Sequence, residues 1–165
     1  MANIMSEMQY DARMAALRTK FPTQFDCLAN RIFCFPGWLP LFEKLCADVD
    51  LALNKTDHPE CFHCVQVKEK FGTLRAYYRG QSIPVDCQIP ARGRIIVFTS
   101  ADVEKEQPGV WRMIRTLVDQ AELASAGKCL WCGARGRLFC VDGWLATQCE
   151  EHQNLSWTTF SFSIQ

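Results

Sequence analysis

The sequence lacks any long uninterrupted hydrophobic run. Its apolar runs reach only four residues, as at 95–98, whereas a membrane-spanning helix needs about 20. The N-terminal segment also lacks the apolar stretch of a signal peptide and carries Glu7 and Asp11. These absences predict a cytoplasmic protein that has no membrane partner.

The sequence also lacks an excess of charge of either sign. Eighteen basic and eighteen acidic side chains give a net charge of zero over 165 residues. This balance excludes a DNA mimic, which needs an acidic excess, and a strongly basic nucleic-acid coat protein. A local basic patch is still compatible with this overall balance, because residues 66–94 carry six basic groups and two acidic ones, a net charge of +4.

Catalytic motifs are missing as well. The sequence contains no phosphate-binding loop, no Gly-x-Gly-x-x-Gly motif and no Gly-x-Ser-x-Gly nucleophile turn. Only three histidines are present, and a metal site can use one of them, so groups suited to acid–base catalysis are few. We therefore predict that the protein is not an enzyme.

Ten cysteines stand out against these absences. Without an export signal, metal ligation and buried free thiols explain them better than disulfides do. The motif Cys-Leu-Trp-Cys-Gly occupies residues 129–133, and the motif Cys-Glu-Glu-His occupies residues 149–152, with sixteen residues between the inner two cysteines. A spacing of two residues lets both ligands of one tight turn reach a single zinc ion.

The segment between these motifs predicts a zinc ribbon. Residues 137–141 and 144–148 flank Asp142-Gly143, a pair typical of a two-residue hairpin turn. The four predicted ligands of one Zn²⁺ per chain are Cys129, Cys132, Cys149 and His152. Four protein ligands leave no position for water, so the site is predicted to be structural. Cys140 is interpreted as a packing thiol, with replacement of His152 as a ligand as the alternative.

A second cluster contains Cys61, His63 and Cys64. A redox-active Cys-x-x-Cys pair normally opens a helix, whose dipole lowers the thiol pKa, but this pair runs into a predicted strand. A second metal site would need a further ligand such as Cys27 or Cys34. The preferred interpretation is buried thiols beside a loop histidine.

Hydrophobic periodicity predicts three helices. Apolar residues recur at helical spacing over 6–20, and again along 41–49 after a break at Pro36-Gly37. A third helix is expected to begin near 108 and to end at Gly127, with Ala124 among its inward residues.

Strand alternation predicts a small antiparallel sheet. A hairpin is expected from 62 to 78 with a charged tip at 70–72, followed by an extended loop over 80–94 and a short strand over 95–99. The fold class is therefore α+β, with helices packed on the sheet and a C-terminal zinc-ribbon hairpin.

We divide the chain into an α+β core, residues 1–127, and the ribbon with its tail, residues 128–165, packed together as one compact unit. The tail alternates weakly over 155–164. It is expected to close a sheet edge of its own domain, or alternatively to pair with the edge of another copy. The oligomeric state is left open.

Residues 67–75, Val-Lys-Glu-Lys-Phe-Gly-Thr-Leu-Arg, together with the paired cysteine motifs, resemble a family of small proteins from bacteriophages and prophages. The family pattern is Lys-Glu-Lys-Phe-Gly-Gly-Leu-Arg, a helix, Cys-x-x-Cys-Gly and a terminal Cys-x-x-His. This chain departs from it at Thr73, where the second glycine is usual, and at Leu130-Trp131, where a glutamate is common. The resemblance implies a zinc-binding accessory protein in the cytoplasm of a bacterial host.

A phage origin implies a role directed at the host, such as inhibition of a bacterial defence system through binding of one of its proteins. The residues expected to contact this partner are Lys68, Lys70, Phe71 and Arg75. The alternative is a nucleic-acid-binding ribbon protein that uses the same segment together with Arg135 and Arg137.

Overall fold

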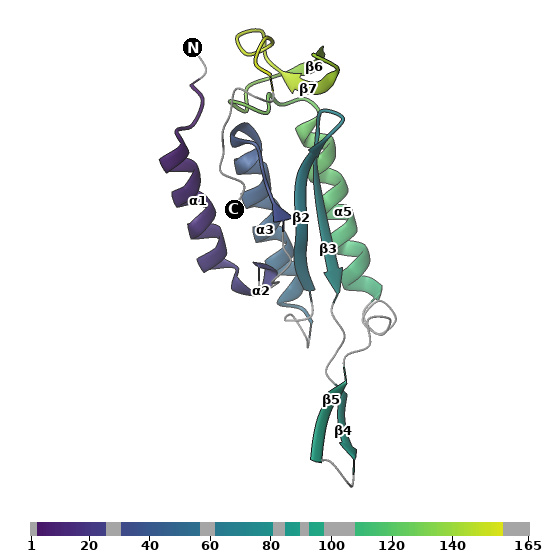
Figure 1. Cartoon of the computed structure of the whole chain (residues 1–165). Helices are drawn as coiled ribbons and strands as arrows, with labels where there is room; N and C mark the ends of the chain where they lie inside the picture. Colours follow the sequence, from purple (N-terminus) through teal and green to yellow (C-terminus); the bar gives the residue numbers. More distant parts are fainter. Residues whose placement is uncertain are drawn as a thin grey trace.

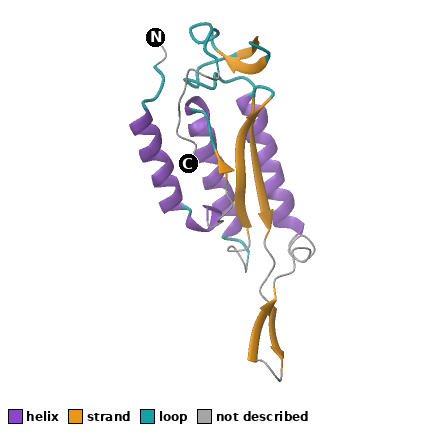
Figure 2. Ribbon diagram, in the orientation of Figure 1, coloured by secondary structure: helices purple, strands orange, loops and turns teal. Residues whose placement is uncertain are grey.

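Helices pack against a small three-stranded sheet, and a two-stranded ribbon follows the last helix, so the fold is α+β as predicted (Figures 1 and 2). The computed structural model describes residues 3–25, 31–56, 62–80, 85–89, 93–97 and 108–156. No helix within these ranges is long and apolar enough to cross a membrane.

The elements are, in chain order, α1 (Glu7–Lys20), α2 (Pro22–Phe25), β1 (Arg31–Ile32), the 3-10 turn η1 (Pro36–Trp38), α3 (Leu39–Leu53), β2 (Phe62–Lys70), β3 (Thr73–Gly80), β4 (Val85–Ile89), β5 (Gly93–Val97), α5 (Pro108–Ser125), β6 (Arg137–Val141) and β7 (Trp144–Gln148).

Helix α1 begins where a capping box precedes it. The Ser6 hydroxyl accepts a hydrogen bond from the Gln9 N–H, and the Gln9 side chain accepts one from the Ser6 N–H, which satisfies two donors at the helix start. The buried residues of α1 are Tyr10, Met14 and Leu17. A two-pronged ion pair between Arg13 and Glu43 joins α1 to α3.

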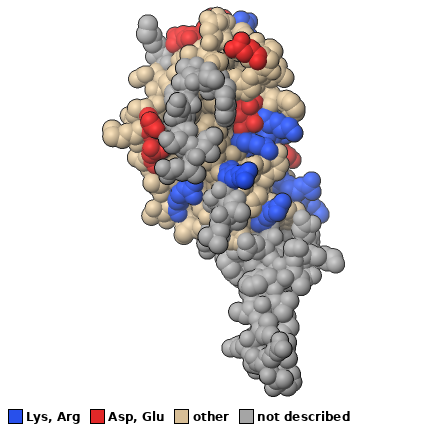
Figure 3. Space-filling model, in the orientation of Figure 1, with Lys and Arg blue, Asp and Glu red and all other residues tan. Residues whose placement is uncertain are grey.

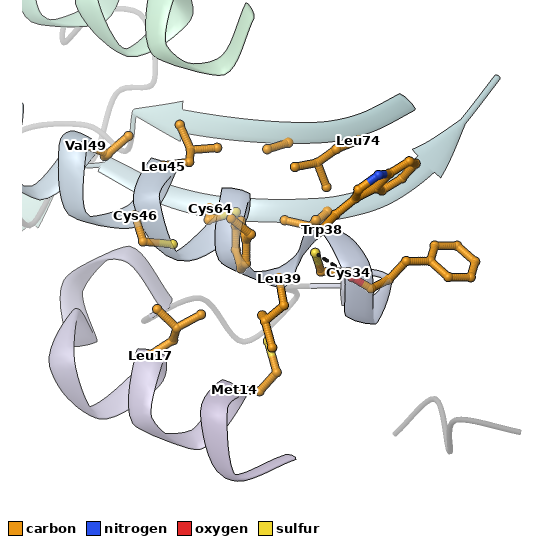
Figure 4. Close-up of a cluster of buried hydrophobic side chains, with 14 of the residues drawn as sticks. Met14, Leu17, Cys34, Trp38, Leu39, Leu45, Cys46, Val49, Cys64 and Leu74 are labelled. Carbon is orange, nitrogen blue, oxygen red and sulfur yellow. Dashed lines mark hydrogen bonds between the residues drawn. The ribbon is translucent and has the colours of Figure 1, made fainter. Parts of the chain in front are cut away.

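Helix α3 forms the centre of the core. Its buried residues are Leu39, Phe42, Leu45, Cys46, Val49, Ala52 and Leu53, which include most of the predicted stripe. Figure 4 shows Met14 and Leu17 of α1 on one side of this helix and the β2–β3 strands on the other. Because α3 contacts both layers, its apolar side chains are shielded on two sides.

The sheet has the order β1-β2-β3, with β2 antiparallel to β3 and β1 parallel to β2. The pairing of β2 with β3 is irregular between Cys64 and Gln66. Such a bulge changes which residues face the core: Cys64 is buried before it and Val67 after it. In β3 the alternation is regular, and its buried residues are Leu74, Ala76 and Tyr78.

The C-terminal end of α5 is fixed against strand β3. The Leu74 N–H donates to Ser125 Oγ over 2.8 Å, and the Ser125 hydroxyl donates to the Glu122 carbonyl over 2.6 Å. The Glu122 carboxylate also pairs with Arg75 of β3 at 2.5 Å. These contacts join the end of α5 to β3, and the first gives the backbone N–H of Leu74, on the edge strand of the sheet, a side-chain acceptor.

Three details of the sequence prediction are wrong. The expected extended loop over 80–94 contains β4, which pairs with β5 in a two-stranded sheet. Strand β5 begins at Gly93, two residues before the strand expected at 95–99, of which residues 98 and 99 lie outside the described residues. Ala124, expected to face inward, is exposed on α5, which ends at Ser125, two residues before Gly127. The prediction for the tail concerns residues 155–164, most of which lie outside the described residues.

Candidate metal centre

The two cysteine motifs bring four metal-ligating side chains together. The Sγ atoms of Cys129, Cys132 and Cys149 and a ring nitrogen of His152 all lie within 4.8 Å of one another. Cys132 Sγ is 3.8 Å from Cys149 Sγ, and His152 Nδ1 is 3.6 Å from Cys129 Sγ and 3.2 Å from Cys149 Sγ. The cluster contains the four ligands predicted from the sequence, and Nδ1 is the ring nitrogen that faces the sulfurs.

These separations fit a tetrahedral zinc ion. Zn–S bonds of about 2.3 Å and Zn–N bonds of about 2.0–2.1 Å place neighbouring sulfurs about 3.8 Å apart, and sulfur and nitrogen about 3.5 Å apart. The Cys132–Cys149 sulfur separation is 3.8 Å, and His152 Nδ1 lies 3.6 Å from the sulfur of Cys129 and 3.2 Å from that of Cys149. The remaining pairs of ligand atoms lie within 4.8 Å. Three thiols and one imidazole form a donor set that zinc prefers, so the cluster is compatible with zinc binding.

The backbone of the first motif forms a tight turn. The Gly133 N–H donates to the Cys129 carbonyl over 2.8 Å, and the Cys129 N–H donates to the Ala134 carbonyl over 2.7 Å. Gly133 has a φ of +77°, a conformation that favours glycine because a Cβ would meet the backbone. The turn therefore directs both thiols to the same side.

The predicted hairpin positions the second motif. Strands β6 and β7 pair in the register Arg137↔Gln148 to Val141↔Trp144. Asp142 and Gly143 connect them with φ values of +51° and +79°, as a type I′ turn requires. The Leu130 N–H then donates to the Thr147 carbonyl over 2.9 Å, which ties the first motif to the end of β7 just before the second.

The site is closed to solvent on one side. Cys129 is fully buried, and His152 is 9% exposed. Burial raises the pKa of the Cys132 thiol above its ordinary value, and the neighbouring thiols of Cys129 and Cys149 raise it further. A bound cation would stabilise the thiolate forms of these cysteines, and four protein ligands would complete its tetrahedral shell.

Aromatic side chains attach the ribbon to the core. The Phe35 ring lies 5.1 Å from Trp131 of the first motif, edge to face, and 5.9 Å from Trp144 of β7, stacked. Trp38 of η1 donates from Nε1 to the Lys128 carbonyl over 2.8 Å. Phe35, Trp38 and Trp131 are at most 1% exposed, so the ribbon and the core share one apolar cluster.

Gly37 fits closely against the first motif. Its N–H donates to the Leu130 carbonyl over 2.8 Å. A Cβ at this position would lie 2.2 Å from the Cys129 carbonyl oxygen and 2.4 Å from the Gly133 nitrogen. The sequence marks Gly37 as a helix-breaking residue only. No local pattern identifies it as part of the metal centre, because its partners are about 90 residues away along the chain.

The β2–β3 turn also packs on the ribbon. The Glu69 carboxylate accepts hydrogen bonds from the Gly72 N–H over 2.7 Å and from Trp144 Nε1 over 2.9 Å. The Thr147 hydroxyl donates to the Gly72 carbonyl over 2.7 Å. Phe71 and Gly72 of this turn have positive φ values of 55° and 78°. In the segment Lys-Glu-Lys-Phe-Gly, the glutamate and the glycine therefore have a structural role.

Replacement of Glu69 by alanine should destabilise this junction. The Gly72 N–H and Trp144 Nε1 would lose a charged acceptor, and each hydrogen bond to a charged group contributes about 1.5–3 kcal/mol. We expect the free energy of unfolding to fall by about 2 kcal/mol in denaturant titrations. Lys68→Ala, on the opposite face of the same strand, is the control and should change it by less than about 0.5 kcal/mol. An equal effect of the two substitutions would contradict this role of Glu69.

The four residues predicted to contact a partner are only partly available. Lys68 and Lys70 extend over the rings of Tyr77 and Phe71, each at 5.2 Å. Phe71 is 63% exposed at the turn. Arg75, in contrast, pairs with Glu122, and both side chains are about two-thirds buried or more, at 32% and 26% exposure. Arg75 therefore stabilises the contact between β3 and α5.

The remaining thiol predictions have mixed outcomes. Cys140 is exposed and lies outside the metal cluster, so its interpretation as a packing thiol is wrong. Cys64 is buried, and His63 is 5% exposed with Nδ1 bonded to the Thr23 carbonyl over 2.8 Å. Cys61 lies outside the described residues, within which the ribbon cluster is the one group of three or more potential ligands.

Comparison of the chain with protein-family models, with curated proteins and with solved structures finds no match.

Proposed function

We propose that this protein is a non-enzymatic, zinc-stabilised binding protein that acts by contacting an anionic surface of a host macromolecule. The observation that carries the proposal is the cluster of Cys129, Cys132, Cys149 and His152 within 4.8 Å. With four protein ligands a zinc ion has no open position for water or substrate, so its role would be to hold the ribbon in place.

The ribbon in turn supports a surface suited to binding. Gly72 and Glu69 attach the β2–β3 turn to β7, and the neighbouring Lys70 and Phe71 are exposed. A rigid support reduces the conformational entropy lost on association. Cations beside aromatic rings suit a partner that is anionic.

The resemblance to phage and prophage accessory proteins supports a host-directed role. Under this proposal the protein acts in the cytoplasm of a bacterial host and inhibits a defence system by occupying the anionic surface of one of its components. The anionic surface would belong to a host protein of the defence pathway or to a nucleic acid bound to that protein.

Affinity capture from a bacterial host lysate tests the proposed function. The wild type is expected to retain a host macromolecule that the double variant Lys68→Glu/Lys70→Glu retains at least about tenfold less, since two charges are reversed on the contact surface. The matched control is Arg112→Glu/Arg115→Glu, which reverses two exposed charges on α5 and should retain as much as the wild type. Equal retention by both double variants, or no specific retention by the wild type, would contradict the proposal.

A further inference from the structure

One face of the β1–β2–β3 sheet is turned away from the core. Residues of β3 alternate between buried Leu74, Ala76 and Tyr78 and the opposite face. The register places residues of β1 and β2 beside that opposite face. We call its accessible part the outer sheet face; it consists of Arg31, Gln66, Lys68, Lys70, Thr73, Arg75, Tyr77 and Arg79. His63, which the register pairs with Arg79, is excluded because it is 5% exposed and its Nδ1 is bonded to the Thr23 carbonyl of α2. Figure 3 shows Lys and Arg side chains gathered over the β2–β3 pair on this side of the molecule.

The outer sheet face carries basic groups and no acidic residue. Five of its eight residues are Lys or Arg. Arg75 is neutralised by Glu122 of α5. The other four cations, Arg31, Lys68, Lys70 and Arg79, form no ion pair with any carboxylate in the described part of the chain. Glu69 lies between two of them in β2, but its carboxylate is directed to Gly72 and Trp144. The unpaired cations leave an electropositive surface.

An aromatic ring lies among these cations. Tyr77 is 41% exposed, and its side chain lies on the outer sheet face between those of Arg75 and Arg79 along β3. Lys68 of the neighbouring strand lies 5.2 Å from the centre of its ring. Phe71, 63% exposed, continues the aromatic surface at the turn. An exposed aromatic ring flanked by cations can stack on a base while the cations bind the adjacent phosphates.

Stacking distinguishes between the anionic ligands that would fit. In a duplex the flat faces of the bases are covered by neighbouring bases, so stacking on Tyr77 would add little to the affinity. In a single strand the bases are free to stack on aromatic side chains. An acidic protein surface would use the cations but would gain little from a base-sized aromatic platform. The combination therefore favours a single-stranded nucleic acid.

We propose that the outer sheet face binds a single-stranded nucleic acid, with a base stacked on Tyr77 and phosphates at Arg31, Lys68, Lys70 and Arg79. The inference rests on the proposed function and gives its anionic partner a chemical class. It also adds Arg31 of β1 to the segment 66–94, in which the sequence placed the basic and aromatic groups of the contact.

Fluorescence anisotropy with labelled oligonucleotides tests this inference. The probes are a single-stranded oligothymidylate, an oligouridylate of the same length, a DNA duplex of that length and a poly-glutamate peptide. Both single strands should bind more tightly than the duplex and the peptide. If four phosphates are neutralised, the logarithm of the single-strand association constant should fall with the logarithm of salt concentration with a slope of roughly −3.

Variants at Tyr77 separate stacking from charge. Tyr77→Ala should weaken single-strand binding about tenfold and leave the weaker duplex binding unchanged, whereas Tyr77→Phe should retain wild-type affinity. Because Tyr77 is exposed, zinc content and thermal unfolding should be the same in all three proteins and serve as the folding control. Lys68→Glu/Lys70→Glu should weaken binding of every anionic probe.

Three results would overturn the inference. These are equal affinity for single strand and duplex, no effect of Tyr77→Ala on single-strand affinity, or binding of poly-glutamate alone. In the last case a charge-dependent contact would persist, and the proposed function would stand with an acidic protein as its partner. If no anionic probe binds and the lysate capture also fails, both proposals fall together.

Discussion

Replacement of Cys132 by serine is expected to remove zinc from the protein and to unfold the β6–β7 ribbon. A serine hydroxyl remains protonated at neutral pH and is a poor zinc ligand, so the site would retain three strong donors. Structural zinc contributes roughly 10–16 kcal/mol of apparent binding free energy in small zinc-binding peptides, and this free energy is available only to the folded site. Metal analysis of the purified wild type should find one zinc per chain, and the variant should have lost most of it.

The loss should extend beyond the ribbon. Trp131 and Trp144 pack on Phe35 of the core, and Glu69 hydrogen bonds to Trp144, so a disordered ribbon would expose apolar surface on both sides of the junction. We expect the free energy of unfolding to fall by at least about 4 kcal/mol, which lowers the midpoint of thermal unfolding by roughly 10 °C in a domain of this size. A metal chelator should produce the same shift in the wild type.

Cys140→Ser provides a matched control. Cys140 lies in the same ribbon, on strand β6, but it is exposed and outside the ligand cluster. Its replacement should leave both the zinc content and the midpoint of thermal unfolding unchanged. If Cys132→Ser kept one zinc per chain, Cys132 would not be a required ligand; if the wild type bound no zinc, the ribbon would be held by packing alone.

The ribbon could be predicted because its determinants are local. Each ligand pair comes from a single turn, and Asp142-Gly143 selects the hairpin that brings the turns together. The start of α1 was equally local, since Ser6 and Gln9 form the capping box within one turn. Interactions between residues this close in the sequence can be predicted without knowledge of the tertiary structure.

The junctions between ribbon and core could not be predicted. Glu69 and Trp144 are 75 positions apart, and neither lies in a sequence pattern that identifies the other as its hydrogen-bond partner. Arg75 looked like a free cation in the sequence because Glu122 lies on a distant helix. Tertiary contacts between such residues depend on the arrangement of whole elements, which periodicity does not specify.

Cys140 illustrates a different difficulty. Strand β6 reads Arg-Leu-Phe-Cys-Val, with apolar residues on both of its faces. Alternation alone cannot decide which face is buried when both are apolar. In the structure Phe139 and Val141 are partly buried, whereas Leu138 and Cys140 point to the exposed side. The prediction for Cys140 failed because its strand carries no polar face.

Replacement of Gly37 by alanine should show how strongly the core and the metal centre depend on each other. The added Cβ would lie 2.2 Å from the Cys129 carbonyl oxygen, 2.4 Å from the Gly133 nitrogen and 2.8 Å from the Cys132 nitrogen. All three are backbone atoms of the ligand turn, so no side chain can rotate away to make room. The turn itself has to move, and with it two of the four ligands.

Overpacking of this kind costs about 1–3 kcal/mol, and we expect Gly37→Ala to lower the free energy of unfolding by about 3 kcal/mol because three backbone contacts are affected. The displaced turn should also hold zinc less tightly, which competition with a chromogenic chelator measures. Gly109→Ala is the control, since a Cβ at Gly109 in α5 would have no neighbour within 4 Å; helix propensity predicts unchanged or slightly higher stability for it. If Gly37→Ala lowered stability without changing zinc affinity, the ligand turn would be able to adjust independently of the core, and the close fit at Gly37 would concern packing only.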